Sequence, residues 1–289
     1  MNYRTDDTDD SRLVTLAKKG QKKALETLIK KYQDWIYNLA LRMVGNPDDA
    51  QDITQEVLIK LITKLSTFRN QSSFKTWLYR ITVNHFMNMK KYTWERMFSR
   101  FEKHDRFKQH LDQMEISNTP SHYPDEQLIV EETRSLCMTG MLLCLDRDQR
   151  LVFILGSVLG IESKMGGEIL EMRPDNYRQI LSRARKQLSN FMNEKCGLLN
   201  ENNPCRCAGK TRALIKAGWI DPDHLRFNKR AALQVKEFIT EKKHFIDNAL
   251  ENKMQYLFQH EPMLHSPDLV NLINTMLKRK PISDIINFN

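Results

Sequence analysis

The chain has 289 residues and a formal net charge of +9, and hydrophobic residues make up 40% of it. This length fits two or three small domains, and the positive charge favours an anionic partner. Gly and Pro are sparse and good helix formers are frequent, so the composition disfavours a strand-rich class. The first ten residues are acidic, and no apolar segment reaches the roughly 20 residues that span a bilayer, which argues against a signal peptide and a membrane span. Five cysteines are too few and too unevenly placed for a disulfide framework, so we expect a protein of the reduced cytoplasm.

The N-terminal part predicts two helices joined by a tight break. Residues 1–20 read as a leader that runs into a first helix. From Ala24 to Val44 the apolar residues recur at steps of three and four, which predicts a long amphipathic helix. Gly45 suits the C-terminal end of that helix, and Asn46 with Pro47 suits the cap and first position of the next one.

The helix expected at 47–65 has an apolar side and an acidic side. Asp52 and Glu56 are four residues apart, so their carboxylates project from one face. A general acid and base pair is one interpretation, although no nucleophile, metal ligand or pocket is evident nearby. A solvated face and a docking surface for a basic partner helix are the other two. The same side also carries Asp49, Gln55 and Lys60.

The stretch 74–91 predicts a helix that combines an apolar stripe with positive charge. Ser72 or Ser73 can cap its start. Its bulky residues recur at steps of three and four, which stacks them on one side of the helix. These residues are Phe74, Trp77, Leu78, Ile81 and His85, and we expect Phe74 and Trp77 to be core residues rather than stacking platforms. The cations off the stripe are Lys75, Arg80, Lys90 and Lys91.

The middle of the chain predicts a basic linker followed by further helices. From Lys75 to Lys108 there are nine Lys or Arg against three acids, and the linker expected at 93–124 ends in a segment with Pro120 and Pro124. We expect a helix at 125–145 with Cys137 and Cys144 in its core. Asp146 is expected to cap the next helix, which buries Leu151, Val152, Ile154 and Leu155.

Residues 163–193 have the pattern of a helix-turn-helix. The first helix is expected at 163–170, the turn at 171–173 and the second helix at 174–193. The inward positions of the second helix are Tyr177, Leu181, Ala184 and Leu188. A recognition helix needs Arg, Asn or Gln near its start, although a basic surface helix has a similar composition. The polar residues expected to face outward are Arg173, Asp175, Asn176, Arg178, Gln179, Arg183 and Arg185.

The C-terminal third opens with clustered cysteines and continues with apolar residues at helical spacing. Cys196, Cys205 and Cys207 match no zinc pattern and have no evident fourth ligand nearby, so a metal or redox-sensing site stands beside free thiols in a packed turn. We expect a long helix around 235–250 and shorter ones at 267–278 and 282–287. This extension reads as a regulatory segment that folds back on the DNA-binding domain or is offered to a partner.

Eleven residues between Asp49 and Asn84 resemble, in order, the pattern of a known family. The sequence DAQDITQEVLIKL at 49–61, then Phe68, then FKTWLYRITVN at 74–84 resembles the second conserved region of bacterial RNA polymerase sigma factors, most of all the extracytoplasmic-function (ECF) group. The matching residues are Asp49, Ala50, Asp52, Gln55, Glu56, Phe68, Phe74, Trp77, Leu78, Ile81 and Asn84. The resemblance implies that the acidic helix binds the clamp helices of the largest polymerase subunit. It also implies that the helix after it opens and reads the minus-ten promoter element.

The segments LDRDQRLVFIL at 145–155 and LSRARKQL at 181–188 resemble the fourth region of the same family, which binds the minus-thirty-five element. Four residues depart from that pattern. Gly166 and Gly167 stand where the family usually has apolar residues, Glu171 replaces the usual turn Gly, and Arg173 replaces the usual capping Ser.

We therefore predict an all-α sigma factor with two small helical domains joined by a basic linker. The predicted parts are a leader at 1–20, region 2 at 21–92, the linker at 93–124, region 4 at 125–195, and a Cys-containing turn with a helical extension at 196–289. The predicted partners are core RNA polymerase, promoter DNA and an anti-sigma protein, without a cofactor and without an enzymatic activity. Two rivals remain: a stand-alone helix-turn-helix regulator and a thiol- or metal-responsive regulator.

Overall fold

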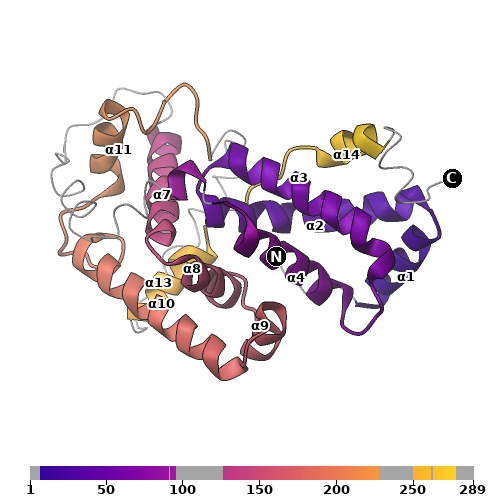
Figure 1. The fold of residues 1–289 in the computed structure, drawn as a ribbon. Helices are drawn as coiled ribbons and strands as arrows, with labels where there is room; N and C mark the ends of the chain where they lie inside the picture. The colour runs from indigo at the N-terminus through magenta and orange to yellow at the C-terminus, as the bar shows by residue number, and fades with distance from the viewer. Residues whose placement is uncertain (1–6, 91, 96–125, 228–249, 262, 278–289) are drawn as a thin grey trace. The chain divides into compact units, whose positions relative to one another are not determined.

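The computed structural model describes residues 7–90, 92–95, 126–227, 250–261 and 263–277 (Figure 1). Within these ranges the regular structure is helical and no strand occurs, which confirms the all-α prediction. The chain forms two compact units. The first unit comprises Met1–Tyr92, Ile161–Tyr177 and Met263–Asn289, and the second comprises Thr93–Gly160 and Arg178–Pro262.

The first unit is built around a long central helix. Its helices are α1 (Asp7–Lys18), α2 (Lys22–Val44), α3 (Pro47–Lys64), α4 (Phe74–Asn88), α9 (Ser163–Leu170) and α14 (Leu269–Leu277), with a 3₁₀ turn at Leu65–Thr67. Helix α2 packs against α1 and α3, and α4 packs against both of these. The Trp35 ring of α2 stacks on the Tyr79 ring of α4 with centroids 3.7 Å apart. The apolar periodicity of the sequence thus produces the predicted bundle.

The break between α2 and α3 has the predicted chemistry. Gly45 ends α2 with φ 80°, a left-handed conformation that costs glycine little, and its N–H donates to the Leu41 carbonyl. The Asn46 side chain accepts hydrogen bonds from the N–H groups of Asp48 and Asp49, and Pro47 is the first residue of α3.

Helix α4 differs from the prediction in which face it buries. Ser73 caps it by accepting from the Thr76 N–H, as one of the two predicted caps. Phe74, Leu78 and His85 are buried as expected, but Trp77 and Ile81 are only half-buried. Tyr79, Thr82, Val83 and Phe86 are buried instead. The helix is enclosed by α1 and α3 together, so its buried side is wider than the stripe and is rotated from it. The helix also ends at Asn88, so Lys90 lies beyond it, and Lys91 lies outside the described residues.

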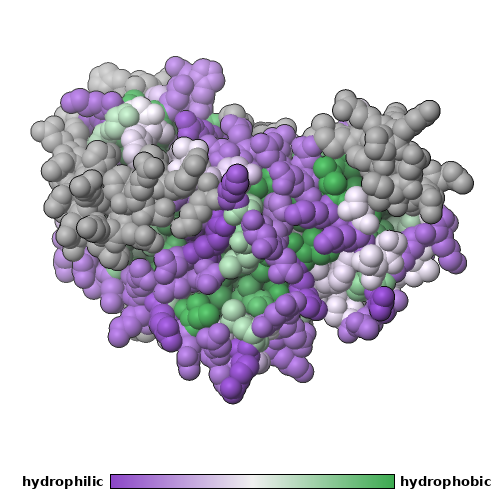
Figure 2. Space-filling model, viewed as in Figure 1, coloured by the Kyte–Doolittle hydropathy of each residue, from purple (hydrophilic) through white to green (hydrophobic). Residues whose placement is uncertain are grey.

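The second unit contains α7 (Glu126–Leu143), α8 (Arg147–Phe153), most of α10 (Pro174–Lys195), α11 (Cys207–Lys216) and α13 (Leu250–Gln259). A π-helical turn at Ile154–Val158 continues α8. Helix α13 packs on this turn, where the Phe258 ring meets Phe153 edge-on and the Gln259 side chain donates to the Ser157 carbonyl. Figure 2 shows mostly hydrophilic residues on the face that it draws, with hydrophobic residues between them.

Two further expectations differ from the structure, and two others fall outside the described residues. Asp146 lies at the start of α8, but its side chain makes no capping hydrogen bond. Cys207 begins helix α11, where the sequence predicted only a packed turn, because α11 packs its buried residues against α7. The helix expected around 235–250 lies almost wholly outside the described residues, as does the one at 282–287.

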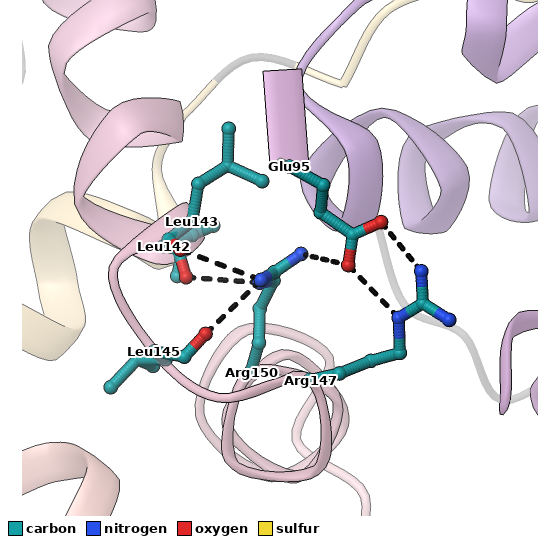
Figure 3. A network of polar contacts seen from close by, with 6 residues as sticks. All are labelled: Glu95, Leu142, Leu143, Leu145, Arg147 and Arg150. Carbon is teal, nitrogen blue, oxygen red and sulfur yellow. Dashed lines mark hydrogen bonds and ion pairs between the residues drawn. The ribbon is translucent and has the colours of Figure 1, made fainter. Parts of the chain in front are cut away.

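A buried ion-pair network ties Glu95 to α8 (Figure 3). Arg147 holds the Glu95 carboxylate with two hydrogen bonds of 2.9 and 2.6 Å. Arg150 adds a third of 3.1 Å and donates to the carbonyls of Leu142 and Leu145, at the end of α7. Burial raises the pKa of Glu95, but the hydrogen bonds and charges of the two arginines outweigh burial, so its pKa is lowered.

We expect Glu95→Gln to destabilise the second unit by about 3–5 kcal/mol, because it leaves the buried Arg150 charge uncompensated. A lowered folded-state pKa means that the contribution of Glu95 is present above the unfolded-state pKa and is lost as pH falls through the folded value. Urea unfolding of the wild type and the variant should therefore differ at pH 7, begin to approach each other below the ordinary pKa of 4.5, and agree below the lowered folded-state pKa. Glu201→Gln, at an exposed position of the same unit, is the control. A gap that persists in acid would contradict this account.

Candidate functional site

The acidic side of α3 is the first candidate surface. Asp52 and Glu56 are exposed, and Asp49 and Gln55 are half-buried on the same side. The opposite side of α3 is fully buried through Ile53, Val57 and Leu61. Partial burial and the neighbouring charges of Asp52 and Asp48 raise the pKa of Asp49. A cationic partner would relieve this repulsion between like charges.

A neutral histidine borders the acidic side. The buried His85 ring lies between Lys60, whose Nζ is 2.6 Å from Nδ1, and Glu56, whose Oε2 is 3.5 Å from Nε2. Burial and the Lys60 charge lower the pKa of His85 to about 4. His85 is therefore neutral at pH 7, so its approach to Glu56 is not an ion pair there. Burial and the charges of Glu56, Asp49 and Asp52 raise the pKa of Tyr92, which places Tyr92 near the same side.

Helix α4 carries a second candidate surface. Trp77, Arg80 and Asn84 follow at steps of three and four, so they share one side of the helix. The Trp77 ring lies against the rings of Phe68 and Phe74, at centroid distances of 5.2 and 5.7 Å. These contacts hold an aromatic ring half-exposed beside an arginine. The arrangement can meet an unstacked base and a phosphate together.

Two cations of α4 contact other side chains: one lies over an aromatic ring and the other pairs with a carboxylate. The Lys75 ammonium lies 5.6 Å from the centroid of the Tyr79 ring. Arg80 donates to the Glu171 carboxylate over 2.6 Å, and both side chains are largely exposed. Exposed pairs of this kind contribute about 0–1 kcal/mol, so Arg80 can exchange Glu171 for another anion at little cost.

The helix-turn-helix forms with the predicted bounds for α9 and the start of α10. Glu171 ends α9 in a left-handed conformation with φ 53° and ψ 39°, which a β-carbon disfavours. Gly166 and Gly167, which differ from the family pattern, allow other atoms to pack closely against α9. A β-carbon on Gly166 would lie 2.4 Å from the Tyr177 ring, and one on Gly167 would lie 2.7 Å from the Met172 carbonyl oxygen. The tight approach of the turn to α9 therefore requires glycine at both positions.

Most polar candidates on α10 are exposed. They are Arg173, Asp175, Asn176, Arg178, Gln179 and Arg183. Arg185 differs from the expectation, because it is half-buried and its Nε donates to the Ser157 hydroxyl over 2.9 Å. The π-helical turn that carries Ser157 was not foreseen in the sequence, so neither was this contact.

The cysteines gather more closely than the sequence suggested. Burial, followed by the neighbouring Cys207, Cys205 and Cys196, raises the pKa of Cys137, which places this residue of α7 near the other three thiols. The hydrogen bond of 2.8 Å between Thr133 and Thr211 explains this, because Cys137 is one turn after Thr133 and Cys207 one turn before Thr211. Within the described residues, no group of three or more His, Cys, Asp or Glu side chains is arranged to hold a metal ion. Burial, followed by the charges of the other cysteines, raises the pKa of Cys207 to about 12, which disfavours the reactive thiolate.

Comparison with known proteins identifies the family. The sequence pattern of Sigma-70 region 2 matches residues 28–96. The RNA polymerase sigma-H factor of Pseudomonas aeruginosa is 44% identical over 75 residues, which are 26% of this chain and 39% of that protein. The ECF sigma factor SigE of Mycolicibacterium smegmatis is 27% identical over 168 residues, 58% of this chain and 61% of that protein. The ECF RNA polymerase sigma-E factor of Escherichia coli is 30% identical over 190 residues, which are 63% of this chain and 93% of that protein.

The chain belongs to the ECF sigma factor family. It spans 39% of the length of the first of these relatives and 61% of the second. In this ECF sigma factor, the region 2 match begins within α2, includes α3 and α4, and ends at residue 96. The described part of the chain contains no helix long and apolar enough to cross a membrane.

Sequence reasoning missed several residues that shape these surfaces in the ECF sigma factor. His85 was assigned to the apolar stripe, but the fold sets it between Lys60 and Glu56. Glu95 lay unnoticed in a basic stretch, and no local pattern distinguishes it from the other acids there. Two glycines inside a helix indicate a close approach of another element, and this signal identifies Gly166 and Gly167.

We expect Glu171→Gly to stabilise the helix-turn-helix by about 1 kcal/mol, because glycine adopts the left-handed turn without strain. The lost ion pair with Arg80 is exposed and offsets little of this gain. Glu168→Gly is the matched control: it removes the same side chain from an exposed position inside α9 and should cost about 1 kcal/mol. Thermal unfolding of the three chains checks the opposite signs, and two shifts of the same sign would count against the strained turn.

Proposed function

We propose that this chain is a sigma factor that binds core RNA polymerase and directs promoter-specific initiation of transcription, including opening of the DNA. The observation that carries the proposal is its 30% identity to the E. coli ECF sigma-E factor over 93% of that protein. Sigma factors are initiation factors, so the function requires no catalytic group in the chain. The proposed site of action is the cytoplasm, where the polymerase works.

The proposed polymerase contact is the acidic side of α3, through Asp49, Asp52, Gln55 and Glu56. Its partner would be the clamp helices of the largest polymerase subunit. The support is electrostatic: two exposed carboxylates lie on one side of a helix whose other side is fully buried. Such a side can dock on a partner without any change in the core of the first unit.

The proposed DNA contacts divide between two helices. For the opened minus-ten element they are Lys75, Trp77, Arg80, Asn84, Lys90 and Lys91. For the minus-thirty-five element they are Arg173, Asn176, Arg178, Gln179, Arg183 and Arg185. The half-exposed ring of Trp77 and the exposed polar start of α10 support this division. Because Arg185 already bonds Ser157, we propose that it steadies α10 more than it reads DNA.

The proposed domain layout keeps region 2 at 21–92, the linker at 93–124 and region 4 at 125–195. An anti-sigma protein remains a predicted partner. A stand-alone helix-turn-helix regulator is the rival, and it would leave the acidic side of α3 without a role. The raised thiol pKa values of Cys205 and Cys207 speak against a thiol switch in the resting state.

Charge reversal by Asp52→Lys with Glu56→Lys should weaken binding to purified core polymerase by at least about tenfold, because like charges placed against each other cost several kcal/mol. The control is Glu162→Lys with Glu168→Lys, which makes the same change in net charge at exposed positions of the first unit. Fluorescence anisotropy gives the dissociation constants, and circular dichroism checks the fold. Equal affinity of the two double variants would remove the acidic side from the interface. Failure of every chain to bind polymerase would favour the stand-alone regulator.

We expect Arg183→Ala to weaken binding of duplex DNA and to lower the slope of log K against log salt by about 1, because one phosphate contact is lost. Arg12→Ala, an exposed arginine of α1, is the control and should leave the slope unchanged. Titrations of the holoenzyme with a duplex of random sequence at several salt concentrations measure both quantities. An unchanged slope for Arg183→Ala would show that this side chain does not touch the backbone.

A further inference from the structure

Helix α2 is buried more completely than a bundle of α1 to α4 requires. Every residue from Trp35 to Val44 is buried. An amphipathic helix of a small bundle normally keeps one side in water. The additional cover comes from the C-terminal extension, because α14 packs against α2 and α3 (Figure 1).

Polar side chains of α2 hold the C-terminal extension in place, mostly through hydrogen bonds to its backbone. Asn38 is 1% exposed: its amide nitrogen donates to the Leu264 carbonyl over 2.7 Å, and its oxygen accepts from the Leu264 N–H over 2.8 Å. Asp34 accepts from both the N–H and the hydroxyl of Ser266, over 2.9 and 2.7 Å. One turn of α2 separates Asp34 from Asn38, so the segment 264–266 lies along the helix.

Helix α14 completes the cover with an apolar side. Asp268 precedes the helix, and one of its oxygens accepts from the Asn271 side chain over 2.7 Å. Leu269, Val270 and Ile273 are buried, whereas Asn271 and Thr275 are exposed. The extension therefore docks through two elements, an extended stretch on a polar stripe of α2 and a short amphipathic helix on α2 and α3.

The polar residues of α2 that the segment covers can be exposed to water as well as buried. Asp34, Asn38 and Arg42 occupy successive turns of α2, and all three side chains are polar. A surface that stays covered is made at lower cost from apolar residues, because buried polar groups must each find a partner. Asp34, Asn38 and Arg42 can form hydrogen bonds with water when the segment 264–266 detaches from α2. The stripe thus has the composition of a face that is sometimes open.

We propose that the segment Met263–Leu277 is an internal occupant of a partner-binding face on region 2, and that it competes with core RNA polymerase for this face. The proposal rests on the proposed function. Helix α14 lies against α3, whose acidic side is the proposed polymerase contact. The proposal requires that polymerase bound to α3 also occupies the part of α2 and α3 that the segment covers, so only the open fraction of the chain binds polymerase. The apparent dissociation constant is then the intrinsic one divided by the open fraction.

The test compares Ile273→Asp with Thr275→Asp in the full-length chain. Each variant adds one negative charge to α14, the first at a residue that is 1% exposed and the second at an exposed residue. Hydrogen exchange reports whether the segment 263–277 detaches, and exchange in α2 to α4 away from the covered stripe reports whether region 2 stays folded. Anisotropy with purified core polymerase reports the affinity of each chain.

We expect Ile273→Asp to speed exchange at Leu264 and Ser266 and to tighten polymerase binding by about tenfold if a tenth of the wild-type chains are open. Thr275→Asp should match the wild type in both measurements. Faster exchange with unchanged or weaker affinity would overturn the competition, and unchanged exchange would overturn the docked segment itself. If neither the wild type nor any variant binds polymerase, the proposed function fails instead, and the exchange data still judge the docking.

Discussion

The burial of α2 on all sides from Trp35 to Val44 is the constraint on which the first unit depends. Helices α1, α3 and α14 all pack against this one helix. Its apolar residues face α1 and α3 through ordinary close packing, which accounts for the completely buried Leu28, Ile36 and Met43. Its polar residues face the C-terminal extension through hydrogen bonds. One side of α2 thus belongs to an apolar core, and another side is held by hydrogen bonds that water can replace.

Charge is separated between the helices that surround this core. Helix α3 presents carboxylates, whereas α4 presents Lys75 and Arg80 and the start of α10 presents further cations. Burial and Lys60 keep His85 neutral between α3 and α4, so the acidic side of α3 is not neutralised from within. The acidic and cationic side chains of the first unit thus lie mainly on different helices.

The second unit depends on a different kind of interaction. Glu95 and Arg150 are both buried, and their pair is completed by Arg147 and by the backbone carbonyls of Leu142, Leu143 and Leu145, at and just after the end of α7. A buried pair of charges is tolerated only when every polar atom has a partner. This condition fixes where Glu95 meets α8, in a region where the apolar pattern offers little guidance.

The sequence by itself determined several of the helices and the break between α2 and α3. Apolar spacing predicted α2, α3 and α14, and Gly45, Asn46 and Pro47 predicted the break between the first two. Helix period and capping are local properties, so they can be read from neighbouring residues. The family pattern at 49–84 likewise depends on residues that lie close together in the chain.

Only the tertiary structure decided which of these helices meet and which side each one buries. The rotated face of α4, the pairing of Asn38 with Leu264 and the approach of Cys137 to Cys207 each join residues far apart in the chain. The glycines of α9 weaken a helix when judged locally, and their reason lies in the Tyr177 ring packed against Gly166 and the Met172 carbonyl oxygen close to Gly167. Such contacts depend on how whole elements pack, and the free energy of that packing is shared among many residues that no local pattern records.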